Sequence, residues 1–352
     1  MNKNIFIGDR EISNTSPVFI IAELSCNHNG KLDLALKTID AMHEAGADCV
    51  KLQTSKPDSI TIDCSAESFI IKGGTLWDGK TLFELYQQVY TPWEWHEEIK
   101  NYVESKGMVF FSSPFDLKAV DFLEELGVPA YKIASFEITD IPLIEYTAKK
   151  GKPIIISTGI ATEQDIELAI QTCKNVGNED VIILKCTSAY PTPLEEVNLK
   201  VIPDIRKRFN CLVGLSDHTM GTIVPLGAVS LGAKVIEKHF ILDRSLGGPD
   251  AAFSMEPAEF KEMVDTVRMM EKALGKVTYE LSEKVMKNKQ FARSLFITED
   301  VKENTIITAE NVKSIRPGNG LHPKYYNEIL GKTFNQQLLR GTPLTIEMIN
   351  KE

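Results

Sequence analysis

Short apolar runs rich in β-branched residues recur along most of the chain, and a stretch with helical periodicity follows each one. The runs occupy residues 18–24, 48–54, 108–114, 130–135, 153–158, 181–187, 211–217 and 234–240. The helical stretches occupy residues 31–45, 92–106, 116–126, 140–150, 162–175, 195–208, 221–231 and 257–274. Strands that alternate with helices pair in parallel through right-handed crossovers. Eight such units predict a (β/α)8 barrel, and their even spacing favours it over the alternative, a doubly wound open sheet.

Two regions depart from this alternation. Residues 55–91 separate the second strand from its helix and are too long for a routine loop, which suggests a functional role. From residue 276 the chain becomes polar and basic, and short strand-like pieces follow. We therefore expect a barrel over residues 1–275, a linker over 276–292 and a small β-rich domain over 293–352. A domain this small has a thin core and is expected to pack on another surface.

Every predicted barrel strand ends in polar side chains, and the carboxyl ends of barrel strands carry the active site. Those at or just after the strand ends are Glu23, Lys51, Gln53, Ser112, Ser113, Lys132, Ser135, Glu137, Ser157, Thr158, Lys185, Thr187, Ser188, Ser216, Asp217, His218, Glu237, Lys238 and His239. Strand ends are solvated, which accounts for serine and threonine. It accounts less well for lysines inside apolar runs, because a buried lysine needs an anionic partner.

An anionic ligand is favoured for Lys51 and Lys132, and structural ion pairs with Glu23, Glu137 or Glu237 are the alternative. For Lys185 and Lys238, an anionic ligand and a structural ion pair are equally favoured. Side chains two residues apart on a strand share a face, as Glu237 and His239 do. Lysines gathered with hydroxyl groups predict a local site for phosphate or carboxylate.

His218 and His239 end adjacent strands, so their imidazoles can share a divalent ion. Imidazole suits Mn, Fe, Co, Ni or Zn. Two protein nitrogens leave positions open for water or substrate, as a catalytic ion requires. A lone histidine is more often a general acid or a core residue, and the pair favours the metal.

Composition narrows the partners and the compartment. The formal net charge of −10 argues against nucleic acid and anionic membrane as partners. No run approaches about 18 consecutive apolar residues, and the first residues do not resemble a signal peptide. The six cysteines are scattered, as is typical of reduced cytoplasmic thiols. A cytoplasmic location is expected.

Several motifs together resemble the N-acetylneuraminate (sialic acid) synthase family along nearly the whole chain. They are AELSCNHNG, VKLQT, FSSPFD, YKIASFE, STG, CTSAYPTP, GLSDHT, EKHF, GGPD and RPGNG. The resemblance implies a (β/α)8 barrel followed by a C-terminal antifreeze-like (SAF) domain. It also implies a transferase that condenses phosphoenolpyruvate with an N-acetylated sugar aldehyde, releases phosphate and forms a nine-carbon 2-keto acid for flagellin or surface polysaccharide.

The resemblance also implies roles for individual residues. The implied phosphoenolpyruvate ligands are Lys51, Ser113, Lys132, Ser135, Ser188 and Ser216, with Ser188 standing where the family often has asparagine. The implied sugar ligands are Gln53, Glu137, Tyr190 and Arg316. His218 and His239 would bind Mn2+, or Mg2+ or Co2+ in its place. Glu23 would orient or deprotonate the attacking water or pass a proton to the aldehyde oxygen, and Asp250 would lie near the metal or the sugar.

Two further features follow from the resemblance. Residues 73–96 resemble the insertion of those members that use 2,4-diacetamido-2,4,6-trideoxy-L-altrose, an apolar sugar that a lid containing Trp77, Phe83 and Tyr86 would suit. Trp93 and Trp95 are expected to pack the helix that follows. Arg316 would reach the partner subunit's barrel, which implies a domain-swapped homodimer.

Three alternatives remain open from the sequence. The sugar could be that of a sialic or legionaminic acid synthase. The barrel could be a metal-dependent aldolase or isomerase, or could form a Schiff base through Lys132. The chain could instead be a binding module, which would leave the polar groups at the barrel mouth unexplained.

Overall fold

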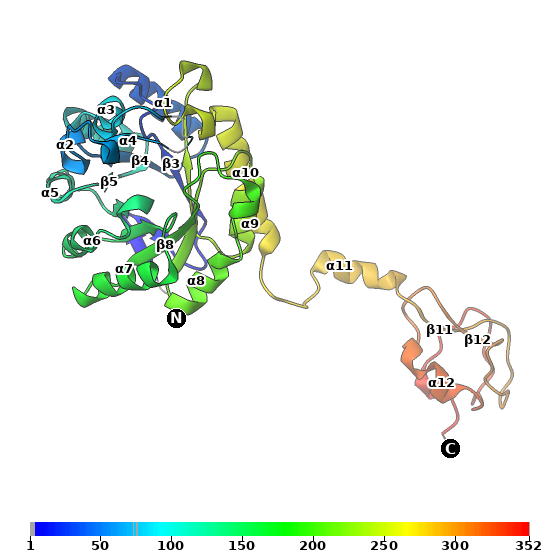
Figure 1. Ribbon diagram of the computed structural model, residues 1–352. Coiled ribbons are helices and arrows are strands. Elements are labelled where there is room, and N and C mark those ends of the chain that lie inside the picture. The colour runs from blue at the N-terminus through cyan, green and yellow to red at the C-terminus, as the bar shows by residue number, and fades with distance from the viewer. Residues whose placement is uncertain (1–3, 73, 75–76, 352) are drawn as a thin grey trace. The chain divides into compact units, whose positions relative to one another are not determined.

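The computed structural model describes residues 4–72, 74 and 77–351. The chain divides into two compact units, of which the first ends at Gly275 and the second begins at Lys276 (Figure 1). Residues 73, 75 and 76, which form part of the insertion noted above, lie outside the described residues.

The first unit is built on a closed barrel of eight parallel strands, which confirms the predicted fold. The strands are β3 (Phe19–Glu23), β4 (Cys49–Thr54), β5 (Val109–Pro114), β6 (Tyr131–Ile133), β7 (Ile154–Ser157), β8 (Val181–Cys186), β9 (Leu212–Asp217) and β10 (Val235–His239). β10 pairs with both β9 and β3, which closes the ring. The strands read as apolar runs because a parallel barrel buries both of their faces.

Helices surround the barrel, one after each strand (Figure 1). They are α1 (Leu32–Glu44), α4 (His96–Ser105), α5 (Leu117–Glu125), α6 (Ile141–Ala148), α7 (Glu163–Asn175), α8 (Val201–Phe209), α9 (Ile223–Ser230) and α10 (Pro257–Leu274). A capping box begins α7, because the Thr162 side chain accepts a hydrogen bond from the Asp165 amide and the Asp165 side chain accepts from the Thr162 amide. All eight predicted helices are confirmed, although two begin later than expected.

Both late starts have local causes. A 3-10 turn occupies Leu194–Glu196, and Asn198 then adopts a left-handed conformation with φ of 49°, so α8 starts at Val201. A 3-10 turn at Trp93–Trp95 likewise precedes α4.

A short antiparallel hairpin, β1 (Ile5–Ile7) and β2 (Arg10–Ile12), precedes the barrel and was not predicted. Its isoleucines belong to the same buried cluster as the barrel strands. Arg10 donates to the carbonyl of Gly107, just before β5, so the hairpin lies at the amino-terminal end of the strands. That end of a barrel serves stability rather than catalysis.

The long segment after β4 contains α2 (Pro57–Ile60) and α3 (Leu82–Val89). Thr81 caps α3 by accepting from the Glu84 amide, and the Glu84 carboxylate accepts from the Thr81 amide. The segment therefore has secondary structure of its own beside the carboxyl ends of the strands.

The second unit contains α11 (Glu283–Asn288), β11 (Ser294–Ile297), β12 (Val312–Ile315) and α12 (Tyr326–Ile329). β11 and β12 pair antiparallel, and isolated bridges join other short segments. The unit has its own cluster of buried apolar residues, which includes Leu295, Phe334 and Leu344. Within the described part of the chain, no helix combines the length and apolar character needed to span a membrane.

Candidate active site

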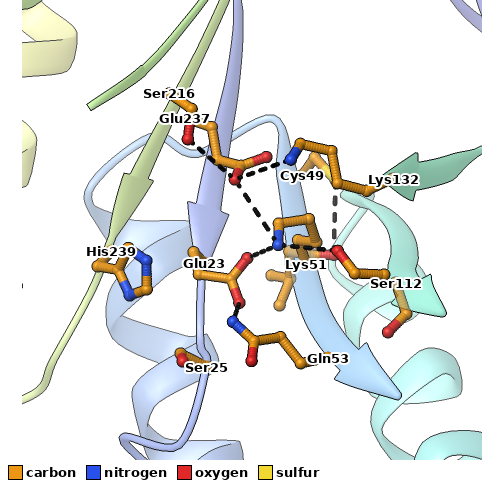
Figure 2. A network of polar contacts seen from close by, with 12 residues as sticks. Glu23, Ser25, Cys49, Lys51, Gln53, Ser112, Lys132, Ser216, Glu237 and His239 are labelled. Atoms are coloured by element: carbon orange, nitrogen blue, oxygen red, sulfur yellow. Dashed lines mark hydrogen bonds and ion pairs between the residues drawn. The ribbon is translucent and has the colours of Figure 1, made fainter. Parts of the chain in front are cut away.

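Two lysines and two glutamates meet inside the carboxyl end of the barrel (Figure 2). Lys51 of β4 forms an ion pair with Glu23 of β3, and its Nζ lies 3.7 Å from Oε1 of Glu237 on β10. Nζ of Lys132 on β6 lies 3.8 Å from the same Glu237 oxygen. All four side chains are at most 6% exposed. Because water does not solvate these buried groups, the charges of the two lysines and the two glutamates must stabilise one another.

Polar neighbours extend this cluster toward the mouth of the barrel. Lys51 donates to Oγ of Ser113 at 3.3 Å, and Gln53 donates to Oε1 of Glu23 at 3.2 Å. Ser216 donates to Oε1 of Glu237 at 3.4 Å. The residues come from β3, β4, β5, β6, β9 and β10, so the closure of the barrel is what brings them together.

The two glutamates of the cluster differ in their acidity. Burial raises the pKa of Glu23, and the nearby charge of Lys51 does not offset that effect. Burial also opposes ionisation of Glu237, but the charges of Lys132 and Lys51 lower its pKa below the ordinary value. Burial lowers the pKa of Lys132, whereas for Lys51 the two glutamates outweigh burial and raise it. Glu23 is thus the carboxyl group better suited to hold a proton.

Ser135 and Ser188 approach each other across Gly159 at the ends of β6, β7 and β8. The Gly159 amide donates to Oγ of Ser135 at 3.1 Å. A Cβ atom at Gly159 would lie 2.0 Å from Oγ of Ser188 and 2.7 Å from Oγ of Ser135, so only glycine fits there. Oγ of Ser188 has no hydrogen-bond partner among the described residues. Its O–H can donate to an anion.

His218 and His239 lie side by side, as expected from adjacent strands, with ring centroids 5.2 Å apart. Nδ1 of His218 lies 3.3 Å from the Thr187 carbonyl, so it donates there and leaves Nε2 with a lone pair. Nδ1 of His239 has no hydrogen-bond partner within the described structure and lies 3.6 Å from Oδ2 of Asp250. Asp250 also accepts from Ser25.

These side chains fit a divalent ion. Burial, followed by the charge of His218, holds the pKa of His239 well below its ordinary value, and a neutral imidazole is the form that binds metal. For His218, contacts with Cys186 and the Thr187 carbonyl outweigh burial and raise the pKa. Among residues 4–72, 74 and 77–351, no three His, Cys, Asp or Glu side chains form a metal-binding group. The two imidazoles would therefore be the protein ligands of such an ion, and water or substrate would fill its other coordination positions.

The cysteine beneath His218 is a contact that the sequence did not indicate. Sγ of Cys186 lies 3.9 Å from Nδ1 of His218. Burial alone would raise the pKa of this thiol, but the contact with His218 lowers it to about 7.

Aromatic rings line the site next to the histidines. The ring of Tyr190 lies 4.6 Å from that of His218 and 5.1 Å from that of Phe253, between centroids. Phe253 also contacts His239, at 5.0 Å. Tyr190 was expected from the resemblance, whereas Phe253 was not, because a phenylalanine carries no polar signal in the sequence.

Glu137 faces the segment after β4. Its Oε2 is buried and has no hydrogen-bond partner among the described residues, and burial raises its pKa to about 7. Burial, followed by the charge of Glu137, raises the pKa of Tyr86 on α3. The predicted lid therefore borders a residue of the site.

A pocket of about 570 Å3 lies between that segment and the loop after β10. Trp77, Lys80 and Gln88 line one side. The other side is lined by Arg244, Gly248, Pro249, Ala251 and Ala252, which surround Asp250 in sequence.

Trp93 and Trp95 pack as expected. The Trp93 ring stacks on Phe122 at 4.6 Å, and the Trp95 ring meets that of His28 edge-on at 5.5 Å.

Two further lysines have partners outside the cluster, and Arg316 belongs to the second unit. Lys185 donates to Oγ1 of Thr187 at 2.9 Å, and Lys238 pairs with Asp217 at 2.6 Å. Arg316 follows β12 in the second unit, and its side chain is exposed. Glu237 joins both lysines, so the structural ion pairs named as the alternative for Lys51 and Lys132 are present. That one glutamate contacts both lysines was not expected.

The matching family models cover most of the chain. Residues 38–279 match the NeuB family, and residues 292–350 match the SAF domain. The chain belongs to the NeuB family. Among its NeuB relatives, a pseudaminic acid synthase of Campylobacter jejuni is 51% identical over 93% of this chain and 95% of its own length. A pseudaminic acid synthase of Helicobacter pylori is 46% identical over 95% of this chain and 98% of its own length.

A solved structure agrees with this NeuB assignment. The N-acetylneuraminic acid synthetase of Leptospira borgpetersenii, in complex with citrate, superimposes with a TM-score of 0.73 at 32% sequence identity. The match covers 82% of this chain and 95% of that one.

Proposed function

We propose that this NeuB-family chain is a pseudaminic acid synthase. It condenses phosphoenolpyruvate with 2,4-diacetamido-2,4,6-trideoxy-L-altrose and water to give pseudaminate and phosphate. The observation that carries the reaction class is the buried cluster of lysines and hydroxyl groups beside two imidazoles. The sugar follows from the relatives, because the pseudaminic acid synthases reach 51% identity and a legionaminic acid synthase of Campylobacter jejuni reaches 39%.

Phosphoenolpyruvate would bind within reach of Lys51 and Lys132, which are the buried cations of the cluster. Ser113, Ser135, Ser188 and Ser216 would supply hydroxyl donors around it. Two buried carboxylates already neutralise the lysines, so a further anion is best accommodated when Glu23 carries a proton. The raised pKa of Glu23 supports that state.

The sugar would lie between the imidazoles and the segment after β4. Gln53, Glu137 and Tyr190 would hydrogen-bond it, and Arg316 of the partner subunit would complete the contacts. The pocket that Trp77 lines gives room for an acetamido group and an apolar methyl carbon. Membership of the NeuB family implies a divalent ion, Mn2+ or else Mg2+ or Co2+, which His218 and His239 would hold. Such an ion supplies Lewis-acid polarisation of the sugar's aldehyde.

The reaction needs one proton donor and one activated water. C3 of phosphoenolpyruvate attacks the aldehyde carbon, and Glu23 delivers its proton to the aldehyde oxygen. Water adds at C2, where positive charge has developed, and its proton passes to the Glu23 carboxylate. The C2 hydroxyl of the resulting tetrahedral centre then becomes the C2 carbonyl as the C2–O bond to phosphate breaks, and its proton leaves with the phosphate. Lys51 and Lys132 stabilise the departing phosphate because they are fixed and shielded from water.

A homodimer with exchanged second units fits the exposed apolar residues near the start of the second unit. Val277 and Tyr279 are 97% and 96% exposed, and Phe291 is 58% exposed. In the proposed exchange, a second copy of the chain would cover these side chains.

Initial rates of phosphate release from phosphoenolpyruvate, with Mn2+ present, test the proposed function. The sugars to compare are the diacetamido-trideoxy-altrose, its gluco- and manno-configured isomers, and N-acetylmannosamine. Release with the altrose alone is expected. Release with another sugar alone would make this a legionaminate or N-acetylneuraminate synthase, and no release with any sugar would refute the condensation.

A further inference from the structure

A second buried ion pair lies behind the imidazoles, on the opposite face of the strands from the lysine and glutamate cluster. Nζ of Lys238 lies 2.6 Å from Oδ2 of Asp217, and these side chains are 0% and 2% exposed. The two residues occupy paired positions of β9 and β10. Their neighbours in the register, Ser216 and Glu237, meet inside the barrel. Strand alternation therefore directs Asp217 and Lys238 outward.

The ion pair is hydrogen-bonded to Thr219, so its contacts lie on both sides of His218 in the sequence. The Asp217 carboxylate accepts from the Thr219 amide at 2.9 Å and from the Thr219 hydroxyl at 3.1 Å. The Lys238 ammonium also donates to the Thr219 carbonyl. These contacts fix Asp217 and Thr219, the residues on either side of His218. Lys238, which contacts both of them from the other strand, immediately precedes His239 in the sequence.

These contacts affect how the rings of His218 and His239 lie relative to each other. His218 follows the end of β9 and His239 ends β10, so their separation depends on how the two strand ends are joined. The pairing of β9 with β10 extends to Asp217 and Lys238 but not to the histidines themselves. The links between the two strand ends beyond the ladder are therefore the ion pair and the hydrogen bond from Lys238 to the Thr219 carbonyl.

We infer that the Asp217–Lys238 ion pair positions His218 and His239 so that both imidazoles bind one divalent ion. This inference rests on the proposed metal site. Asp217 and Lys238 are positioning residues, because their side chains point outward from the barrel, away from the face that carries the imidazoles. Groups that orient metal ligands typically change metal affinity by about 10–100-fold when they are removed.

Mn2+ titration of the full-length chain, followed by the electron paramagnetic resonance of free Mn2+, tests the inference. Asp217→Asn and Lys238→Met are each expected to weaken Mn2+ binding by about 10–100-fold. Either single variant leaves one charge buried without a partner, so it could fail to fold. The double variant Asp217→Asn/Lys238→Met leaves no unpaired charge, and it is expected to fold and still to bind Mn2+ weakly.

Arg268→Met is the matched control. Arg268 pairs with Asp48 at 2.8 Å, and Asp48 precedes β4 at the far end of the strands. This variant is expected to lower the melting temperature and to leave Mn2+ affinity unchanged. Wild-type Mn2+ affinity in the folded double variant would overturn the inference, because the ion pair would then serve stability alone.

A His239→Ala variant separates this inference from the metal site on which it rests. Its Mn2+ binding at the imidazole pair is expected to be lost. If His239→Ala binds Mn2+ as the wild type does, His239 is not a metal ligand. The proposed metal site is then refuted, and so is the positioning role that depends on it. Loss in His239→Ala together with retention in the double variant would overturn the positioning role alone.

Discussion

At the scale of single residues, acidity in this site is set by burial and by the charge that each group faces. Glu23 and Glu237 both lie beside Lys51, yet the pKa of Glu23 is raised and that of Glu237 is lowered. The difference arises because Glu237 faces Lys132 as well as Lys51. One carboxyl group can therefore move a proton while the other holds the two cations in place.

Glu137 gives a test of this electrostatic picture. Burial raises its pKa to about 7 in the folded chain, from about 4.3 in the unfolded chain. The folded state therefore loses stability as the pH rises from about 4 through about 7. Glu137→Gln removes that loss, so the variant is expected to be more stable than the wild type by about 1–3 kcal/mol at pH 8 and to match it at pH 4.

Urea unfolding of the barrel at the two pH values measures this effect. Glu125→Gln, on the exposed face of α5, is the control and is expected to follow the wild type at both. Equal stability of Glu137→Gln and the wild type at pH 8 would contradict the assigned burial of this carboxyl group.

Gly159 gives a second test, of the anion site. In Gly159→Ala the added methyl group would enter the space of the Ser135 and Ser188 hydroxyls. The KM for phosphoenolpyruvate is expected to rise at least about tenfold, because misplaced polar contacts commonly cost about 1–3 kcal/mol, while the KM for the sugar changes little. In the control Gly107→Ala, no atom lies within 4 Å of the added carbon, but the φ of 75° strains the backbone, so this variant shows what destabilisation away from the site does to KM. An unchanged KM for phosphoenolpyruvate in Gly159→Ala would place the phosphate elsewhere.

At the scale of elements, the lid segment is fastened to the barrel by buried histidines. The Gly30 amide donates to Nδ1 of His28, so Nε2 carries the proton and donates to Oγ1 of Thr91 at 3.0 Å. Burial lowers the pKa of His28 to about 4, which keeps this arrangement neutral. Thr54 and His96 make a similar contact at 2.8 Å. The end of the segment is thereby fixed to the top of the barrel.

Thr91→Val is predicted to loosen the segment. The buried His28 N–H then has no acceptor, at a cost of about 1–3 kcal/mol. Faster amide hydrogen exchange is expected in α3, together with a rise in the KM for the sugar that exceeds any rise for phosphoenolpyruvate. Thr172→Val, which removes the 2.8 Å contact with the Leu168 carbonyl on α7, is the control. Wild-type exchange rates in α3 of Thr91→Val would show that this contact does not hold the lid.

The elements that the sequence predicted are those with strong periodicity. All eight barrel strands carry buried apolar runs, and all eight are in place. The hairpin of β1 and β2 was missed because strands of three residues are too short to show alternation. α8 begins late because Asn198 adopts a left-handed conformation, which composition alone does not reveal.

In the site, too, local sequence patterns predicted some residues, and contacts between distant strands determined others. Polar strand ends indicated Lys51, Lys132 and the two histidines. The bridging role of Glu237 depends on distances across the barrel, which no local pattern carries. The outward direction of Lys238 follows from alternation, because Glu237 and His239 face inward, but its pairing with Asp217 depends on the register of two strands.

At the scale of the whole molecule, the proposed exchange of second units predicts complementation between subunits. Arg316→Ala and His239→Ala are each expected to be inactive. If Arg316 acts in the partner subunit's barrel, a mixed dimer contains one site with both residues intact. Random mixing is then expected to restore about a quarter of wild-type activity. Complete inactivity of a mixture that has formed mixed dimers would show that Arg316 acts within its own chain.

If the barrel mouth condenses phosphoenolpyruvate with the diacetamido sugar, the C2–O bond of phosphoenolpyruvate must break. Phosphoenolpyruvate labelled with 18O at its bridging oxygen tests this, by mass spectrometry of the phosphate released in the presence of Mn2+ and the sugar. Phosphate release is expected to depend on the sugar, with the label in the phosphate and none in the nine-carbon product. Label retained in the product, or phosphate release that does not require the sugar, would contradict this condensation.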